Sequence, residues 1–304
     1  MTDTEKPAVS SARVTSVLIL TTLLWGGSFV FNKIAFREIP PVTFMFLRFA
    51  LATLIMGIYC LRRLPALNRE IVKRGGIVGL ALAAANLSFV LGVSGTSVSR
   101  AGFLNNLFVL VIPFLCFLIW RERLDRWSLV GVILAMFGLW QLARGGAAGF
   151  SRGDLMSTVC AVFISIHIIL VSRVLRDEDV YLVTLVQFAT VAAVGALLSM
   201  ALPAQPFRIG PVSAAALLYC AIFPTVVCFT LQNTFQRFTT PSKAGLIYTL
   251  DPVWSMLGGM MVLGERLSQR EWLGCLLIFA AVLVPLTVRR LRERYLIRTY
   301  IGSA

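Results

Sequence analysis

Long apolar stretches alternate with short polar segments along almost the whole chain. A helix needs about 20 mainly apolar residues to cross a hydrocarbon layer of about 30 Å. At that length the pattern predicts about ten membrane-spanning helices. Their predicted ranges are Val14–Phe36, Val42–Leu61, Lys73–Val93, Ser99–Trp120, Trp127–Ala143, Gly153–Arg173, Tyr181–Ala201, Val212–Gln236, Ser242–Leu263 and Glu271–Val288. The connections between them are short, so we expect an all-α integral membrane protein without a soluble domain.

The composition of the chain agrees with a membrane protein and excludes several soluble classes. The sequence has 304 residues, of which 58% are hydrophobic and 14% charged, and its mean hydropathy is +0.84. A soluble domain of this size cannot hide so much apolar surface, because folding leaves a large area in contact with water. A soluble enzyme, a nucleic-acid-binding module and a disordered chain are therefore excluded.

The positive charges predict the orientation of the chain in the membrane. The formal net charge is +14, with 28 Lys and Arg residues. If the N-terminus is cytoplasmic, about 19 of the 28 fall inside and about eight outside, which matches the positive-inside rule. The opposite orientation would invert this bias. We therefore expect a multi-pass protein of the cytoplasmic (inner) membrane, with both termini in the cytoplasm, Ser151 outside and no nucleic-acid partner.

The two halves of the sequence resemble each other at a constant shift. Thr96–Gly102 aligns with Thr239–Gly245, and Glu122–Leu124 aligns with Glu265–Leu267 at the same shift. Several matches at one shift indicate an internal duplication. Each half holds about five spans, and an odd number makes the second copy enter the membrane upside down. The sequence thus predicts ten transmembrane helices as two inverted five-helix repeats, an architecture typical of secondary transporters.

Short motifs occur in an order and spacing that are typical of a known family. They are Trp25–Phe29 in the first span, Phe46–Phe49 in the second, and Leu250–Val253, Gly258-Gly259 and Leu263–Leu267 in the second half. In these motifs the chain resembles the drug/metabolite transporter (DMT) superfamily, in particular its EamA-type members with ten spans. The sequence departs from that pattern where Asp, instead of the more usual Glu, precedes the proline of the third motif.

The resemblance covers both halves and implies a division of the chain. Residues 14–143 would form the first EamA-type five-helix repeat, and residues 153–288 the second, inverted one. A cytoplasmic N-terminal tail, 1–13, and a basic cytoplasmic C-terminal tail, 289–304, would flank them. Members of the superfamily move very different solutes, so the resemblance implies transport without naming a substrate.

Polar residues inside the predicted spans mark a candidate substrate site, because polar side chains are costly in a membrane. With a helix rise of about 1.5 Å per residue, their depths form two layers, each about 10 Å from one membrane face. The outer layer consists of Arg48, Asn86, Asn105 and Asn106. The inner layer consists of Tyr248, Asp251, Gln187 and His167. Two layers that mirror each other are expected of an inverted repeat.

Each of these residues also has a structural interpretation. Arg48 can extend its long side chain toward the outer headgroups. The asparagines can join helices by hydrogen bonds, and His167 can be a neutral, hydrogen-bonded histidine. Asp251 can recognise a solute amine, exchange a proton with the solute, or hold its helix against a neighbour. His167 lies at a similar depth and is a candidate partner for it.

Aromatic side chains near the two layers favour an amphipathic solute such as an amino acid, although residues at these spacings also pack helices. They are Trp25, Phe108, Tyr248 and Trp254, and we add Trp254 to the candidate substrate-binding residues. No P-loop motif occurs, which argues against ATP as the energy source. We predict a secondary transporter that exports small organic metabolites, amino acids or related amphipathic solutes, by alternating access.

An enzyme and a structural protein are the alternatives to a transporter. An enzyme is disfavoured, because Asp251 is the only carboxylate deep in a span and His167 the only histidine. The same scarcity of ligands argues against a metal site, and no cofactor is expected. A structural or lipid-organising membrane protein remains as the alternative. The expected partners are a small-molecule substrate and membrane lipids, with a homodimer as a further option.

Overall fold

The computed structural model describes residues 10–96, 98–143, 150–175, 179–202, 207–254, 256–257 and 268–301, and no strand occurs in these ranges. The helices are α1 (Ser11–Ala35), α2 (Pro41–Cys60), η1 (Leu61–Ala66), α3 (Arg69–Gly95), α4 (Val98–Asn105), α5 (Phe108–Trp120), α6 (Arg126–Ala143), α7 (Arg152–Val174), α8 (Val180–Ala201), α9 (Pro211–Ala221), η2 (Ile222–Val227), α10 (Cys228–Gln236), α11 (Pro241–Tyr248) and α13 (Gln269–Ile301). Of these, η1 is a 3-10 helix and η2 is a π-helix.

Seven helices of the described chain are long and apolar enough to cross a membrane, judged by length and composition. They are Ser11–Ala35, Pro41–Ala66, Arg69–Gly95, Ala101–Trp120, Arg152–Val174, Val180–Ala201 and Pro211–Gln236. The shorter apolar helices Arg126–Gln141 and Trp272–Val288 fall on two further predicted spans. The prediction of an all-helical membrane protein is therefore confirmed. The predicted ninth span, Ser242–Leu263, lies partly outside the described residues.

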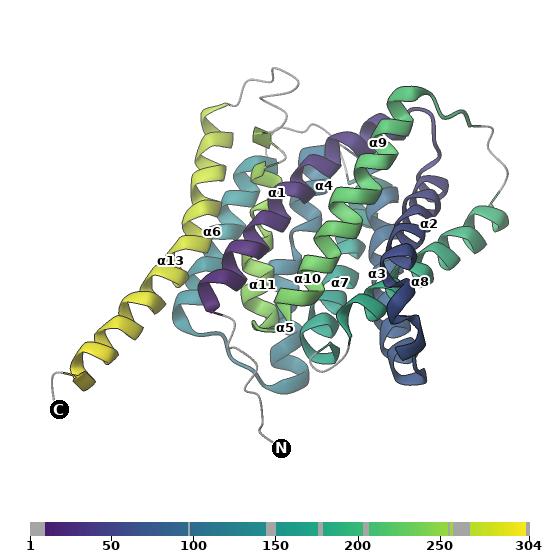
Figure 1. Cartoon of the computed structure of the whole chain (residues 1–304). Helices are drawn as coiled ribbons and strands as arrows, with labels where there is room; N and C mark the ends of the chain where they lie inside the picture. The colour runs from purple at the N-terminus through teal and green to yellow at the C-terminus, as the bar shows by residue number, and fades with distance from the viewer. Residues whose placement is uncertain are drawn as a thin grey trace.

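The long helices form one bundle in which α1 begins and α13 ends at the same side, the lower one in Figure 1. The turn between α1 and α2 lies at the opposite side, as does the start of α9, whereas α10 ends at the lower side. The helical structure of α13 continues to Ile301, so most of the predicted C-terminal tail, 289–304, extends this helix.

Small residues let helices from the two halves of the chain approach closely. α3 packs along α7 and α8, α2 along α8, α6 along α13, and α1 along α9 and α10. On α3, a Cβ atom at Gly75 would lie 2.8 Å from Cβ of Val186, and one at Gly79 would lie 2.7 Å from Cβ of Thr190. Larger side chains would push α8 away, so these glycines permit the close contact that small residues give membrane helices.

Two helices of the bundle are each interrupted by a short non-helical break. α4 ends at Asn105 and α5 begins at Phe108, while α11 ends at Tyr248 and helical structure resumes at Asp251. Pro252 follows the second interruption, and its missing N–H agrees with a break there.

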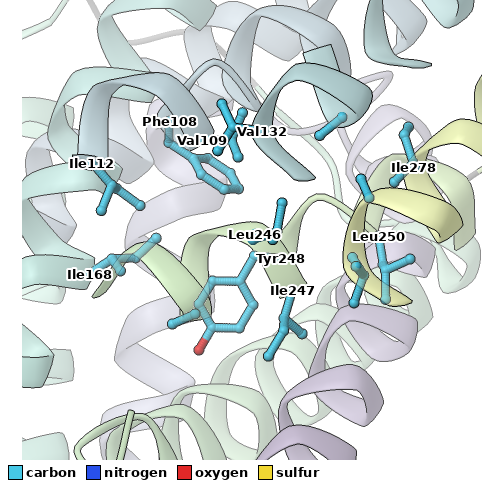
Figure 2. Packing of buried hydrophobic residues seen from close by; sticks show 14 of the residues in the cluster. Phe108, Val109, Ile112, Val132, Ile168, Leu246, Ile247, Tyr248, Leu250 and Ile278 are labelled. Atoms are coloured by element: carbon cyan, nitrogen blue, oxygen red, sulfur yellow. The ribbon is translucent and has the colours of Figure 1, made fainter. Parts of the chain in front are cut away.

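An extended apolar cluster joins helices of both halves around Tyr248 (Figure 2). Its labelled members come from α5, α6, α7, α11 and α13, and one more, Leu250, follows α11. Phe108 and Ile168 are among them, and both are nearly inaccessible to solvent. Because lipid tails are as apolar as these side chains, the cluster stabilises the bundle through close packing.

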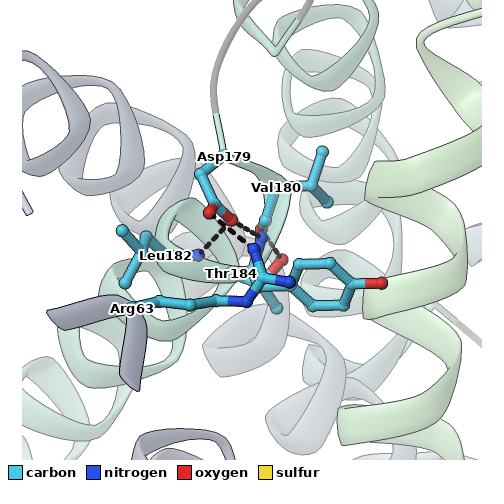
Figure 3. A network of polar contacts seen from close by, with 6 residues as sticks. Arg63, Asp179, Val180, Leu182 and Thr184 are labelled. Carbon is cyan, nitrogen blue, oxygen red and sulfur yellow. Dashed lines mark hydrogen bonds and ion pairs between the residues drawn. The ribbon is translucent and has the colours of Figure 1, made fainter. Parts of the chain in front are cut away.

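An ion pair joins η1, which follows α2, to the start of α8 (Figure 3). It lies on the side of the bundle where α1 begins. Arg63 Nη1 donates a hydrogen bond to Asp179 Oδ2 at 2.9 Å, and the Arg63 guanidinium lies 4.7 Å from the ring centroid of Tyr181. Asp179 also caps α8, since its Oδ1 accepts hydrogen bonds from the backbone N–H groups of Tyr181 and Leu182. Both charged side chains are partly exposed, so we expect the pair to contribute little to the stability of the protein.

A second tie lies on the opposite side, between the α1–α2 turn and the start of α9. Glu38 Oε2 accepts a hydrogen bond from the backbone N–H of Gly210 at 2.8 Å. Hydrogen bonds from the Ser213 side chain and from the Gly210 backbone lower the pKa of Glu38 below its ordinary value. The two halves of the chain are thus tied at both faces of the bundle.

Candidate functional site

A cavity of about 90 Å³ lies inside the bundle, where helices of both halves meet. Its polar lining consists of Ser28, Arg48, Asn86, Asn105, Gln232, Tyr248 and Asp251. Its aromatic lining consists of Trp25, Phe29, Phe89, Phe108 and Phe229, besides Tyr248. A cavity needs about 10–15 Å³ of such volume to hold one water molecule, so this cavity has room for about six to nine water-sized groups. A mainly apolar cavity with a few polar groups is typical of small-molecule sites.

The cavity brings together residues from both predicted layers. Arg48, Asn86 and Asn105 of the outer layer line it, and so do Tyr248 and Asp251 of the inner layer. The helix breaks explain part of this convergence, because Asn105 ends α4 and Tyr248 ends α11. The two layers therefore meet at one cavity instead of facing separate spaces.

Arg48 is buried in α2, and its guanidinium is anchored at one nitrogen. Only 4% of the residue is exposed, and its Nε donates hydrogen bonds to the Thr225 hydroxyl at 2.6 Å and to the Cys220 carbonyl at 3.2 Å. Both acceptors lie at or next to η2, a π-helix, and such helices often mark functional sites. Within the described residues, no acidic side chain pairs with Arg48 and no hydrogen bond holds its two terminal amino groups. Arg48 thus points into the protein and does not reach the headgroups.

Asp251 contributes a carboxylate to the same cavity. Its Oδ1 is buried and has no hydrogen-bond partner among the described residues. Asn105 Oδ1, also at the cavity wall, is buried and lacks a partner in the same part of the chain. A buried acceptor without a donor costs free energy. Gln232 Oε1, on a third lining residue, also lacks a partner among the described residues. Three such atoms at one cavity indicate a place for donors supplied from outside the chain.

Tyr248 connects the cavity wall to deeper hydrogen bonds on α10 and α7. Its hydroxyl donates to Gln236 Oε1 at 3.0 Å, and Gln232 Nε2 donates to the same oxygen at 2.7 Å. Gln236 Nε2 in turn donates to the Ile168 carbonyl at 2.6 Å and to the Ser172 hydroxyl at 2.9 Å. Gln236 therefore joins α10 to α7 and also to Tyr248, the residue that ends α11.

His167 and Gln187 lie outside the cavity lining, in a second group of hydrogen bonds. Their Nε2 atoms are 2.7 Å apart, and Asn233 Nδ2 donates to Gln187 Oε1 at 2.8 Å and to the Thr184 hydroxyl at 2.9 Å. Because the Gln187 nitrogen can only donate, His167 accepts through Nε2, and a neutral ring then carries its proton on Nδ1. The hydrogen-bond partner of His167 is thus Gln187 and not Asp251, the candidate partner named from depth alone.

The carboxamides of α10 are candidate functional residues that the sequence analysis did not name. Gln232, Asn233 and Gln236 are fully buried, and with Gln187 of α8 and their hydrogen-bond partners they form what we call the amide network. They could have been recognised from the sequence, because three carboxamides occur within little more than one turn of a predicted span, where such side chains are costly. The network lies near the ends of α7 and α10 and the start of α8, which places it toward the side where α1 begins.

The remaining predicted site residues form hydrogen bonds within the protein. Asn86 lines the cavity, but its Nδ2 donates to a carbonyl of its own helix at 3.1 Å. Asn106 is fully buried, its Nδ2 donates to a carbonyl of α4 at 2.8 Å, and it does not line the cavity. Trp254 also lies off the lining, and its Nε1 donates to the Thr22 hydroxyl at 2.9 Å. In the described ranges, no three His, Cys, Asp or Glu side chains gather in a group that could hold a metal ion.

Long apolar helices around a cavity with charged, polar and aromatic walls define a multi-pass membrane protein with an internal site. The model of the EamA-like transporter family matches residues 14–144 and again residues 151–287. The chain belongs to the EamA-like transporter family. It is therefore a membrane transporter, in agreement with the resemblance to the DMT superfamily.

Relatives that match across most of the chain are also named transporters. An uncharacterized transporter of Archaeoglobus fulgidus is 30% identical over 267 residues, which cover 88% of this chain and 83% of the relative. The uncharacterized inner membrane transporter YedA of Escherichia coli is 23% identical over 274 residues, which cover 87% of this chain and 88% of YedA. One solved crystal structure, 22% identical, superposes with a TM-score of 0.77 over 93% of this chain and 99% of that one, so the fold is shared.

Proposed function

We propose that the protein is a secondary transporter that exports small organic metabolites, amino acids or related amphipathic solutes, across the cytoplasmic membrane by alternating access. The observation that carries this proposal is the cavity, which combines Arg48, Asp251 and aromatic side chains inside the bundle. Opposite charges and aromatic rings around one small space suit a solute with polar and apolar parts.

Ten spans in two inverted five-helix repeats, residues 14–143 and 153–288, belong to this proposal. The breaks after Asn105 and after Tyr248 are related by the same shift as the sequence matches between the two halves. Helix packing supports it as well. The contact of α3 with α7 has its counterpart in that of α9 and α10 with α1, and the pairs α2–α8 and α6–α13 each join a helix to its own counterpart. Two inverted repeats that are related by a two-fold axis in the membrane plane predict such pairs.

Alternating access requires that the cavity be closed toward at least one side at any time. Hydrogen bonds of the amide network tie α10 to α7 and α8, between the cavity and the side where α1 begins. We assign this side to the cytoplasm on the basis of the positive-inside rule. Opening toward the cytoplasm would then separate these helices, whereas opening toward the outside would leave the network intact.

Solute counterflow tests the transport function directly. Proteoliposomes loaded with an unlabelled mixture of the standard amino acids should transiently accumulate labelled amino acids, and parallel panels of organic acids, amines and sugars cover other metabolites. Asp251→Asn, reconstituted at the same level, should reduce the signal, and empty liposomes give the baseline. Absence of counterflow in every panel would contradict transport and favour a structural or lipid-organising protein.

Cysteine labelling tests orientation and alternation separately. Ser151→Cys, at the start of α7, should react with a membrane-impermeant reagent added from outside. Asn105→Cys and Gln187→Cys should change their reactivity in opposite directions when a transported solute is added. If Ser151→Cys reacts only with permeant reagents, the orientation is wrong, and parallel changes at the other two positions would argue against alternating access.

A further inference from the structure

Two opposite charges face one cavity without a charged partner of their own. Arg48 belongs to the first half of the chain and Asp251 to the second, and both line the cavity. No ion pair within 4.0 Å joins them, since none of the ion pairs of the described residues includes either side chain. The space between them therefore has a positive end and a negative end.

The positive end is oriented for a carboxylate. Hydrogen bonds from Nε to Thr225 and Cys220 hold the plane of the Arg48 guanidinium. The two terminal amino groups, which have no partner in the described chain, form a fork that matches the two oxygens of a carboxylate. A buried positive charge without a balancing anion is costly, so an anionic group is the favoured occupant.

The negative end offers acceptors for an ammonium group. Asp251 Oδ1 and Asn105 Oδ1 are buried atoms of residues that line the cavity, and neither receives a hydrogen bond from any described residue. An ammonium group brings three N–H donors and a positive charge, whereas a hydroxyl brings one donor and no charge. A cation therefore both satisfies the two acceptors and balances the carboxylate.

The size of the cavity and its other walls limit what lies between the charges. The volume of about 90 Å³ leaves room for about six to nine water-sized groups. Trp25, Phe108 and Phe229 provide apolar surface, which suits carbon atoms and not a third charged group. A compact molecule with one charge at each end meets these conditions.

We propose that the cavity recognises a small zwitterion, an aliphatic or hydroxylated amino acid of about six to nine non-hydrogen atoms, with its carboxylate at Arg48 and its ammonium group at Asp251. This inference rests on the proposed transport function and adds the charge and the orientation of the solute. Arg48 then selects against amines that lack a carboxylate, and Asp251 selects against acids that lack an amine.

A series of probes that differ only in charge tests this site in the wild-type protein. The zwitterions are L-alanine, L-threonine and L-valine. Their amides keep only the positive charge, and propionate, 3-hydroxybutanoate and 3-methylbutanoate keep only the negative charge. Calorimetry on the purified full chain measures binding, and competition for counterflow gives a second reading. At least one amino acid should bind about tenfold or more tighter than both of its singly charged analogues, because each analogue leaves one buried charge unpaired.

Two variants should then give opposite patterns. Arg48→Gln should weaken binding of the amino acid by about tenfold or more and leave binding of its amide unchanged. Asp251→Asn should weaken the amino acid to a similar extent and leave the acid without an amine unchanged. Arg48→Lys keeps the charge and replaces Arg48→Gln if loss of the contact to Thr225 prevents folding. Thr234→Val, which removes a hydrogen bond within α10 only, is the matched control and should bind every probe like the wild type.

The outcomes separate this site from the proposed function. Equal binding of the amino acids and their singly charged analogues, or binding of none of the nine probes, overturns the zwitterion site. If an organic acid, an amine or a sugar nevertheless shows counterflow, transport stands and only the zwitterion site is wrong. If an amino acid binds with the expected charge pattern but no solute moves, the site stands and the proposed transport is wrong.

Discussion

Two buried polar regions lie next to each other in the bundle, and they differ in how their polar atoms find partners. In the amide network, most hydrogen bonds run between helices, and Gln236 alone takes part in four, three of them to other helices. In the cavity wall, Asn105 and Asp251 each keep a buried oxygen without a partner among the described residues. The network also contains such oxygens, on Gln232 and Asn233, but their amide nitrogens bond other side chains.

This difference separates residues that hold helices together from residues that can bind a solute. Hydrogen bonds between helices fix α7, α8 and α10 relative to one another, and the polar groups involved are largely satisfied before a solute arrives. Open donors and acceptors in a cavity wall gain partners only from the solute. Gln232 and Tyr248 belong to both regions, because they line the cavity and also donate hydrogen bonds to Gln236. Substitutions elsewhere in the amide network should therefore act on stability, and substitutions elsewhere in the cavity wall should act on transport.

Gln236→Leu should have the largest effect. It removes four hydrogen bonds, of which three reach other helices, and such bonds between membrane helices contribute about 0.6 kcal/mol each on average. We expect a loss of about 2 kcal/mol in unfolding free energy, measured by denaturant titration in mixed micelles. Thr234→Val, the matched control on α10, should cost less than about 0.6 kcal/mol. If the Gln236→Leu protein is as stable as the wild type, the amide network does not hold the helices together as we infer.

Asn105→Ala should separate transport from stability. Asn105 Oδ1 has no partner among the described residues, so we expect the unfolding free energy to change by less than about 0.5 kcal/mol. Counterflow should fall by about tenfold, which corresponds to about 1.4 kcal/mol, because the bound solute would lose one acceptor. Both quantities can be measured on the same preparation. Unchanged transport would exclude Asn105 from the substrate site. A large loss of stability would assign Asn105 to the residues that hold helices together.

A double-mutant cycle tests whether the two regions are energetically distinct. Asn233 and Gln187 are in direct contact at 2.8 Å, so Asn233→Ala and Gln187→Ala should be coupled by about 0.6–1.7 kcal/mol in unfolding free energy. Asn233→Ala and Asn105→Ala share no described hydrogen bond and should be additive within about 0.5 kcal/mol. Coupling of equal size in both cycles would mean that the network and the cavity wall form one unit.

The smallest effect is expected at the exposed Glu38, which belongs to neither region. Its pKa in the folded protein lies below the ordinary value of 4.5, because the Ser213 side chain and then the Gly210 backbone hydrogen-bond the carboxylate. A lowered pKa contributes stability above the unfolded value, and that contribution is lost as pH falls through the folded value. Wild type should therefore be more stable than Glu38→Gln at neutral pH, and the difference in thermal midpoint should shrink as pH falls below 4.5. A difference that is independent of pH would contradict this assignment.

The membrane spans could be predicted because a bilayer requires about 20 apolar residues for each crossing. The predicted span Gly153–Arg173, for example, differs from α7 by one residue at each end. Depth along a helix could be predicted too, because the rise per residue is constant. Depth does not tell which way a side chain points around its helix or which neighbour it meets. For this reason Arg48 and Asp251, assigned to different layers, line one cavity.

The π-helix η2 shows a second limit of the sequence. The hydropathy pattern predicts one regular helix over Val212–Gln236, whereas Ile222–Val227 forms the wider turns of a π-helix around Pro224. Proline lacks the N–H that a regular helix needs, so Pro224 could have indicated an irregular helix at this point. The partners of η2 could not be inferred, because they come from the other half of the chain. Trp25 Nε1, for instance, donates to the Pro224 carbonyl at 2.9 Å.

α3 and α7 are joined at both ends and in the middle. At one end, a Cβ atom at Gly153 would lie 2.5 Å from the Gly95 carbonyl oxygen, so the two backbones touch. Midway, Cys160 Sγ donates to a carbonyl of α3 at 3.2 Å, and at the other end Arg74 Nη1 donates to the Val174 carbonyl at 3.4 Å. α3 comes from the first half of the chain and α7 from the second, so a body that moves as a unit must contain helices of both halves. A chimaera that exchanges one whole half with a relative would separate these contacts, whereas one that exchanges α3 together with α7 would preserve them.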